Sequence, residues 1–456
     1  MSTHSIIGIV AFNVFLLVVG IAVLFGVRGW GSWNELLRLA GFAYMLGVAA
    51  IGVIFVIELV VGLDLSLVTI LLTGFGLIFL GALVGRAFGH RLPPAKLALE
   101  GISLQASLFG ALAIVYAEAL FRSGRLAGLY EFDGWAFWIP KAKAIYFFGG
   151  IDRQFFEQLP GPSYPPLVPA LEAAAFRFMG SPDVVTLHLQ FWFLFVGFLA
   201  ALVGLLAPRV PPLLLWPPIL LLAATPHVLV YALQAQGDFL LDEFFALAAL
   251  LVGMWLAEHQ PWQLAGATLF LAAAMSTKRE GYMLTACVVG AALVVVWRQA
   301  RVLWPRLVLA SVVAVALTIP WRLLLVVRDL THGGAEAGGL GLFEHADRAW
   351  PSFRLALSAL FDFNVWLAVV PLALLAIGAA LFAGAKQLAA YASLLFVLMV
   401  AAFTWVTWAF PTLPITKQAA LNPIVRLSGS LTLALTALVP LLLVAAWRGG
   451  RRSGMR

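Results

Sequence analysis

The sequence predicts an all-α polytopic membrane protein. Of its 456 residues, 63% are hydrophobic and only 11% are charged, whereas a soluble domain carries about 25% charged residues. The apolar residues gather in runs that match the roughly 17–25 residues a helix needs to cross a bilayer. The single cysteine, Cys287, lies inside one of these runs, which excludes a disulfide framework. The bilayer is therefore the expected solvent for most of the chain.

We expect about thirteen transmembrane helices from the lengths of these runs. They lie near residues 4–27, 39–62, 65–85, 97–121, 184–207, 211–233, 238–256, 262–276, 281–297, 305–327, 363–384, 388–410 and 428–447. The first lacks a basic region before it and a clear cleavage site after it, which favours a retained span. The eighth and ninth are short, and the charged run STKREG separates them. Short, interrupted spans often border an aqueous cavity.

The distribution of charge predicts the orientation. If the loop 28–38 is cytoplasmic, that side carries fourteen basic residues and only two acidic residues, Glu35 and Glu258. The basic residues are Arg28, Arg38, Arg86, Arg91, Lys96, Arg209, Arg298, Arg301, Arg306, Lys386, Arg448, Arg451, Arg452 and Arg456. Short loops rich in Lys and Arg stay in the cytoplasm. The C-terminus is then cytoplasmic, and the net charge of +7 reflects topology rather than binding to nucleic acid.

This orientation places several polar segments on the extracytoplasmic side. They are the long loop 122–183, the turn QAQGD that ends at Asp238, the run STKREG at 276–281 and the segment 411–426. We expect short interfacial helices in the loop 122–183. The Gly-rich loop 328–362 is expected to be mobile, because loops of this length are usually functional or disordered.

The long loop contains EFDGWAFWIPKAKAIYFFGG at residues 131–150. Asp133 is either the N-cap of a short interfacial helix or a general base, partly desolvated by aromatic neighbours. Trp135 is expected beside it, either as a residue of the donor-binding site or as an interfacial residue at the headgroup level. Lys141 either meets an anionic headgroup or extends toward water. Further along, Tyr164 either lines the mouth of a cavity or fixes a proline-rich turn.

Charged residues also occur at the ends of later spans. Asp238 begins one span, and acids inside a membrane are functional candidates by default, although a salt bridge between helices is the alternative. Lys278, Arg279 and Glu280 suit a phosphate group, because two cations neutralise it and an acid orients one of them. The alternative is a solvated hairpin turn. Arg426 is either an interfacial anchor or a second arm of the same anion site.

These motifs together resemble the GT-C superfamily of membrane glycosyltransferases, which includes lipid A aminoarabinose transferases and protein O-mannosyltransferases. The resemblance is carried, over residues 97–450, by DGWAFW and YPPLVP in one loop, GDFLLDEFFALAAL, STKREGYMLTA and NPIVRLSGSLTLALTALVP. It implies a bacterial inner-membrane or plasma-membrane enzyme with an extracytoplasmic active site. The donor would be a polyprenyl-phosphate-linked sugar, and the acceptor a glycan, lipid or protein.

The resemblance also implies roles for individual residues. Asp133 would be the general base of an inverting transfer, Asp238 a second acid near the sugar, and Lys278 or Arg279 would bind the donor phosphate together with Arg426. The catalytic loop of the family follows the first helix, whereas here it follows the fourth. We therefore expect four regions: an N-terminal three-span addition (1–96), a catalytic core (97–330), a mobile loop (331–362) and a C-terminal three-span region (363–456).

No cofactor is required by this chemistry, although Asp133 and nearby acids could hold a divalent metal ion. Two alternative functions stay open. An O-antigen ligase or polymerase would use Arg and His in a large loop, where His332 and His345 lie. A transporter or flippase would use Asp238 and Glu118 as coupling groups and would show symmetry between two halves.

Overall fold

A computed structural model describes residues 2–94, 103–126, 128, 131–297, 302–328, 330, 346–409 and 423–453. Within these ranges the secondary structure is entirely helical, as expected from the sequence. The structure therefore confirms an all-α protein with many apolar helices. The loop histidines His332 and His345, and residues 411–422, lie outside the described ranges.

Nine helices in the described part of the chain are long and apolar enough to cross a membrane. They are α1 (Thr3–Val27), α3 (Ala40–Val60), α4 (Leu67–Ala87), α5 (Leu104–Leu126), α9 (Val184–Leu206), α12 (Gly237–Glu258), the pair α15 and α16 (Leu303–Val327), α20 (Lys386–Ala409) and α21 (Pro423–Ser453). Two further helical segments, Ala346–Trp366 and α19 (Val369–Phe382), are bent by 111° relative to each other. Counted together as one broken span, they would make ten.

The expected number of about thirteen full spans is therefore not confirmed. The four expected spans that lack a long helix are each broken or short. The run 211–233 divides into α10 (Pro212–Ala223) and α11 (Pro226–Tyr231), because proline cannot continue a helix and disfavours it in the preceding residue. The run 363–384 breaks at Leu367, where φ is +50°. The helices α13 (Pro261–Thr277) and α14 (Glu280–Val296) have 17 residues each.

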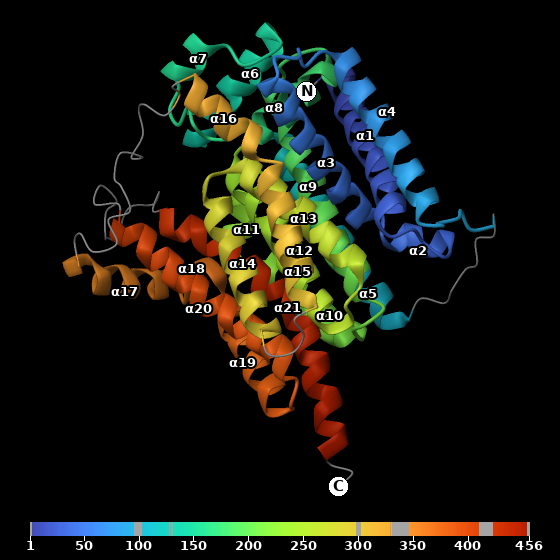
Figure 1. Ribbon diagram of the computed structural model, residues 1–456, viewed down its shortest axis with the longest axis vertical. Coiled ribbons are helices and arrows are strands. Elements are labelled where there is room, and N and C mark those ends of the chain that lie inside the picture. Colours follow the sequence, from blue (N-terminus) through green and yellow to red (C-terminus); the bar gives the residue numbers. More distant parts are fainter. Residues whose placement is uncertain are drawn as a thin grey trace.

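The short helices of the long loop gather at one end of the bundle. They are the π-helical turn η1 (Gly134–Trp138), α6 (Ile139–Phe148), α7 (Arg153–Gln158) and α8 (Leu167–Met179). The N-terminus lies at this α6–α8 end, and the C-terminus lies at the opposite end (Figure 1). The short helix α2 (Trp33–Arg38) follows the end of α1 that is farther from the N-terminus. The remaining short helices, α17 (Ala349–Leu360) and α18 (Phe363–Trp366), precede α19.

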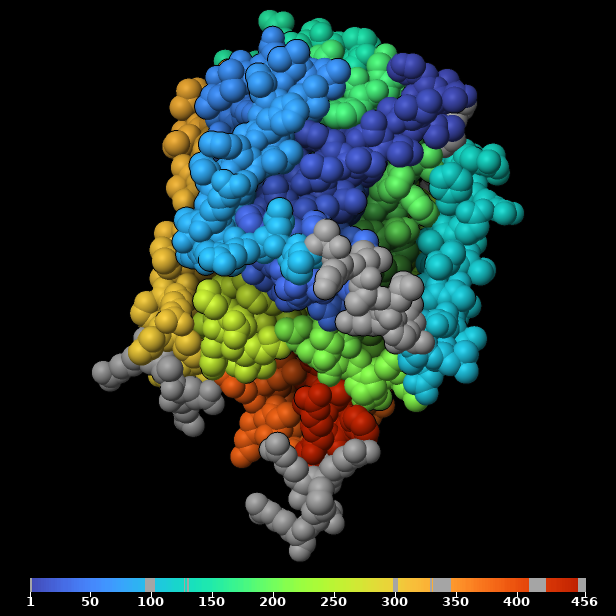
Figure 2. All heavy atoms as spheres, turned by 90° about the vertical axis from the view of Figure 1, so that its right-hand side faces the viewer, coloured from blue at the N-terminus to red at the C-terminus, as the bar shows by residue number. Residues whose placement is uncertain are grey.

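The helix α12 forms the centre of the bundle. The whole of its apolar window is buried, and it packs against α13, α14 and α21. By contrast, only 6% of the α5 window is buried, and α5 lies at the edge of the molecule, away from the neighbouring pair α1 and α4 (Figure 2). In the expected N-terminal addition, α3 packs directly on α8, α9 and α13.

Candidate functional site

Four of the charged residues singled out in the sequence form one ion-pair network. The guanidinium Nη2 of Arg426 lies 2.5 Å from Oδ2 of Asp133. The same group binds both oxygens of Asp238, with Nε 3.2 Å from Oδ1 and Nη2 donating to Oδ2. Lys278 Nζ lies 2.8 Å from Asp238 Oδ1. Segments that are far apart in the sequence therefore meet at the α6–α8 end of the bundle.

Asp133 does not cap a helix through its side chain. It has α-helical φ and ψ angles immediately before η1, and its carboxylate makes no capping bond. Instead the carboxylate faces Arg426 and retains 15% of its exposure. Asp133 therefore stands at the N-cap position of η1 without the side-chain bond that a capping residue makes. The turn that follows is a π-helix, a geometry that is rare and frequent at functional sites.

Lys278 is buried, whereas one of the two alternatives for its segment was a solvated turn. It ends α13 in an extended conformation, and its side chain is only 7% exposed. Burial by itself lowers the pKa of Lys278, but the carboxylates of Asp238 and Glu280 outweigh it and raise the pKa above its usual range. Glu280, in the first turn of α14, lies 3.6 Å from the Lys278 ammonium group. The turn between α13 and α14 therefore forms a hairpin, but Lys278 in it is not solvated.

Tyr164 supports the cations of this hairpin. Its ring lies 5.4 Å from the Lys278 ammonium and 4.9 Å from the guanidinium carbon of Arg279, within the range of cation–π contact. The Phe137 ring stacks against the Tyr164 ring, with 5.8 Å between the ring centroids. The negative charge of Glu280, followed by burial, raises the pKa of the Tyr164 hydroxyl. Tyr164 is thus a component of the cluster as well as part of a turn.

Lys141 does not extend toward water as one alternative supposed. Its side chain is fully buried, Nζ donates to the Gly161 carbonyl oxygen at 2.5 Å, and the Phe137 ring lies 5.2 Å away. Burial, and to a lesser degree the charge of Arg279, lowers the pKa of Lys141 to about 7. Lys141 therefore braces the turn that carries Tyr164 and makes no ion pair with the network.

The two tryptophans of the DGWAFW motif differ in environment. Trp135 is half-exposed and packs edge-on against Phe132 at 5.0 Å, as an interfacial residue would. Trp138 is fully buried, so it is a core residue and not part of an interfacial belt. A Cβ atom on Gly237 would lie 2.9 Å from the Trp138 ring. Trp138 therefore fixes the start of α12, one residue before Asp238.

Glu131 is a component of the site that the sequence reasoning missed. Its Oε1 accepts from the backbone N–H of Ala235 at 2.6 Å and lies 3.4 Å from His188 Nε2. Burial raises the pKa of Glu131, but bonds from His188 and Ala235 outweigh it and lower the pKa. Glu131 therefore ties the segment of Asp133 to the turn before Asp238. Its place in the motif EFDGW was the available signal.

Other acids lie apart from the ion-pair network. Glu118 pairs with Arg122 on α5 and is about half-exposed, so it does not join Asp238. Asp242 and Glu243 are buried in α12, and Asp242 accepts a hydrogen bond from Ser430. In the described ranges no three His, Cys, Asp or Glu side chains are grouped to hold a metal ion. Between Asp133 and Asp238 the cation is the Arg426 guanidinium.

Fold and site together define an integral membrane protein with a mostly buried charged cluster at one end of its helical bundle. No family model, curated protein or solved structure matches the chain. Its function is therefore inferred from its residues and their geometry.

Proposed function

We propose that the chain is a membrane glycosyltransferase that moves a sugar from a polyprenyl-phosphate donor to an extracytoplasmic acceptor. The observation that carries this proposal is the contact of Arg426 with both Asp133 and Asp238, while Lys278 binds the same Asp238. A carboxylate is thereby placed beside cations that suit a phosphate. Proton removal and charge stabilisation, the two needs of glycosyl transfer, could then be met within one cluster.

In the proposed reaction, Asp133 takes the proton of the acceptor hydroxyl. The hydroxyl oxygen attacks the anomeric carbon from the face opposite the phosphate, and the bond between that carbon and the phosphate oxygen breaks. The lipid phosphate leaves with the bonding electron pair. Lys278, Arg279 and Arg426 stabilise the growing negative charge, which is worth most in a site with little water. The anomeric configuration is inverted.

The resting ion pairs suggest how the donor enters this reaction. Arginine forms paired, planar hydrogen bonds with carboxylate and phosphate alike. A donor phosphate can therefore replace Asp133 on the Arg426 guanidinium, while Asp238 stays bound through Nε and Nη2. Asp133 is then free to accept the proton of the hydroxyl. Donor binding would activate the base.

A proton-coupled transporter is the second candidate, favoured by acids buried elsewhere in the bundle. In α12, both carboxylate oxygens of Glu243 and one of Asp242 are buried without a hydrogen-bond partner among the described residues, and so are both oxygens of Glu172 in α8. Buried acids at membrane depth often form proton relays. Glu118, an expected coupling group of this alternative, is about half-exposed on α5, which is itself largely unburied.

A donor labelled at two positions distinguishes the candidates. Membranes that contain the protein are given a polyprenyl-phosphate sugar with ³H in the sugar and ³²P in the phosphate. A transferase moves ³H to an acceptor and leaves ³²P in free lipid phosphate, and D133N membranes do so far more slowly. Movement of the intact donor across the bilayer, with both labels together, would instead support transport and sink the transferase proposal.

A further inference from the structure

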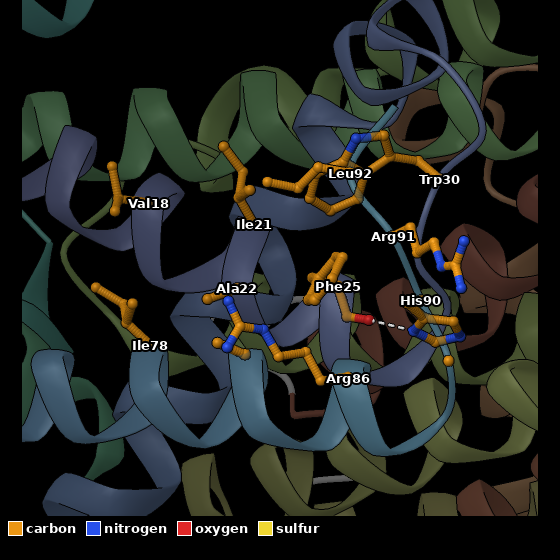
Figure 3. A pocket seen from close by; sticks show the side chains of 12 residues that line it. Val18, Ile21, Ala22, Phe25, Trp30, Ile78, Arg86, His90, Arg91 and Leu92 are labelled. Atoms are coloured by element: carbon orange, nitrogen blue, oxygen red, sulfur yellow. Dashed lines mark hydrogen bonds between the residues drawn. The ribbon is translucent and has the colours of Figure 1, made fainter. Parts of the chain in front are cut away.

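A groove separate from the charged cluster lies between α1 and α4. It has a volume of about 750 Å³, which is within the usual range for a small-ligand site. Val18, Ile21 and Phe25 of α1 and Ile78 of α4 form its apolar wall. Figure 3 shows these side chains on the two helices, with Arg86 reaching from α4 toward Ala22 of α1.

The rim of the groove is basic. Arg86 and Arg91 are exposed, and His90 lies beside Arg91 beyond Phe25 (Figure 3). His90 Nδ1 donates to the Phe25 carbonyl oxygen at 2.6 Å, which fixes the ring against α1. Of the residues that the structure describes, those that line the groove include no carboxylate. A polar compartment of about 390 Å³ adjoins it and shares Trp30, His90 and Arg91.

In the adjoining compartment the acid is already neutralised. Glu35 lies 2.5 Å from Arg28 and accepts the Gly31 backbone N–H at 2.7 Å. The positive charge of Arg86 and Arg91 is therefore uncompensated by the residues that line either space. An anionic headgroup at this rim would lie between guanidinium groups on either side of Phe25 (Figure 3) and would meet no unpaired carboxylate among the described residues that line the two spaces.

The apolar and basic parts of the groove match the two layers of a membrane leaflet, hydrocarbon and headgroups. Its apolar wall belongs to two membrane spans, while Arg86 lies in the last turn of α4 and Arg91 lies just beyond it. Basic residues at the end of a span lie at the level of the lipid headgroups. This end of the bundle is the one that the charge distribution predicts to be cytoplasmic. The groove therefore presents cations to headgroups and hydrocarbon to acyl chains.

We infer that this groove binds one anionic glycerophospholipid of the cytoplasmic leaflet. Its headgroup phosphate lies between the guanidinium groups of Arg86 and Arg91, on the side of His90, and an acyl chain lies along Val18, Ile21 and Ile78. Basic pockets between helices on the cytoplasmic side are suited to such headgroups. This lipid is distinct from the proposed sugar donor, because the charged cluster lies at the other end of the bundle.

The test measures lipid binding to the purified, delipidated protein by native mass spectrometry. The protein is titrated with phosphatidylglycerol and, separately, with zwitterionic phosphatidylcholine. R86Q/R91Q should weaken phosphatidylglycerol binding about tenfold or more and leave phosphatidylcholine binding unchanged. The matched control, R306Q/K386Q, removes two exposed cations near the start of α15 and α20. Equal weakening in both variants, or none in R86Q/R91Q, would overturn the inference.

A second variant tests the acyl-chain part of the groove with its charges intact. V18W places a large ring in the apolar wall at a half-exposed position and should reduce binding of long-chain phosphatidylglycerol. Glycerol phosphate, which has the headgroup chemistry without chains, should not displace the lipid at equal concentration. Displacement by glycerol phosphate would assign the rim to a soluble phosphate, and unchanged binding in V18W would contradict a chain in the groove.

Discussion

Arg426 and Asp133 are 293 positions apart in the sequence, yet their side chains meet at 2.5 Å, each with only about 15% of its surface exposed. Arg426 also binds Asp238, so one guanidinium links the π-helical turn of the long loop to the first turn of α12. A guanidinium suits this task, because it presents five donors in one plane. Removing Arg426 takes from Asp133 the cation that it faces, whereas Arg426 keeps Asp238 when Asp133 is removed.

Asp133→Asn should lower turnover about 10²–10⁴-fold, the usual contribution of a general base. Asparagine has nearly the same shape and competes less with the donor phosphate for Arg426, so donor binding should not weaken. The measurement is sugar transfer per mole of protein at saturating donor, together with donor affinity.

Asp152→Asn is the matched control in the same loop. Asp152 caps α7 by accepting the Phe155 backbone N–H at 2.8 Å, and asparagine caps a helix equally well. Turnover of this variant should equal that of the wild type. Full activity in the Asp133→Asn protein would remove Asp133 from the mechanism.

Arg426→Gln should reduce the free energy of unfolding by on the order of 3 kcal/mol, because Asp133 and Asp238 lose their shared cation. Adding Asp133→Asn should return part of that stability, since Asp133 is the acid that faces Arg426 whereas Asp238 keeps Lys278, yet the double variant should stay inactive. Thermal unfolding in detergent measures the first effect and the transfer assay the second.

The control for Arg426 is Arg209, which binds Glu258 at the opposite end of the bundle through bonds of 2.5 and 2.8 Å. That pair is more exposed, so Arg209→Gln should cost at most about 1 kcal/mol. If Arg426→Gln and Asp133→Asn destabilise the protein additively, the two side chains are not coupled. Recovery of activity in the double variant would leave the network a purely structural role.

Much of the helical layout could be predicted, because apolar length and charge bias report directly on the bilayer. Nine expected spans coincide with long helices. The breaks at Pro226 and Leu367 were missed, since an apolar run looks continuous whether or not its backbone turns. Hydropathy measures transfer to lipid, and it carries little information about where a helix bends.

The sequence predicted which residues of the candidate site share one side of the membrane. It did not predict which of these residues contact one another. The predicted topology places all four charged residues of the network on one side of the membrane, because alternate span ends share a side. Which cation meets which acid depends on helix rotation, and that is set by packing. The burial of Lys141 follows from how the Tyr164 turn folds back over α6.

Lys141 should give the stability of the protein a specific pH dependence. Its pKa falls from the ordinary 10.5 to about 7 in the folded protein, chiefly because burial disfavours the charged form. Below pH 7 both states carry the proton and the fold bears the full cost of the buried charge. Between pH 7 and 10.5 the unfolded chain binds more protons, so stability should rise with pH, by at most about 1.4 kcal/mol per unit.

The comparison of wild type with Lys141→Met isolates this effect. Methionine removes the titrating group while keeping the length of the side chain, and the lost bond to the Gly161 carbonyl oxygen adds an offset that does not vary with pH. The unfolding temperature of the wild type minus that of the variant should increase as the pH rises from 7 to 9. A difference that stays constant from pH 6 to 9 would show that Lys141 does not titrate in this window.

Gly429 allows α21 to approach α12 closely, one turn after Arg426. A Cβ atom there would lie 2.4 Å from Oδ2 of Asp242 and 3.2 Å from Nε2 of His227. Gly429→Ala should therefore destabilise the protein by about 1–3 kcal/mol, the usual cost of overpacking. Because the shift moves α21 away from α12, it should also separate Arg426 from Asp238 and lower turnover.

Gly378→Ala in α19 makes the same chemical change where a Cβ atom meets nothing within 4 Å. It should stabilise the helix by about 0.5–1 kcal/mol, because alanine loses less backbone freedom than glycine. Turnover should be unaffected, since α19 does not carry the charged cluster. Equal stability and activity in the two variants would mean that α21 tolerates a wider spacing from α12, and the position of Arg426 would then depend on its ion pairs rather than on the close approach at Gly429.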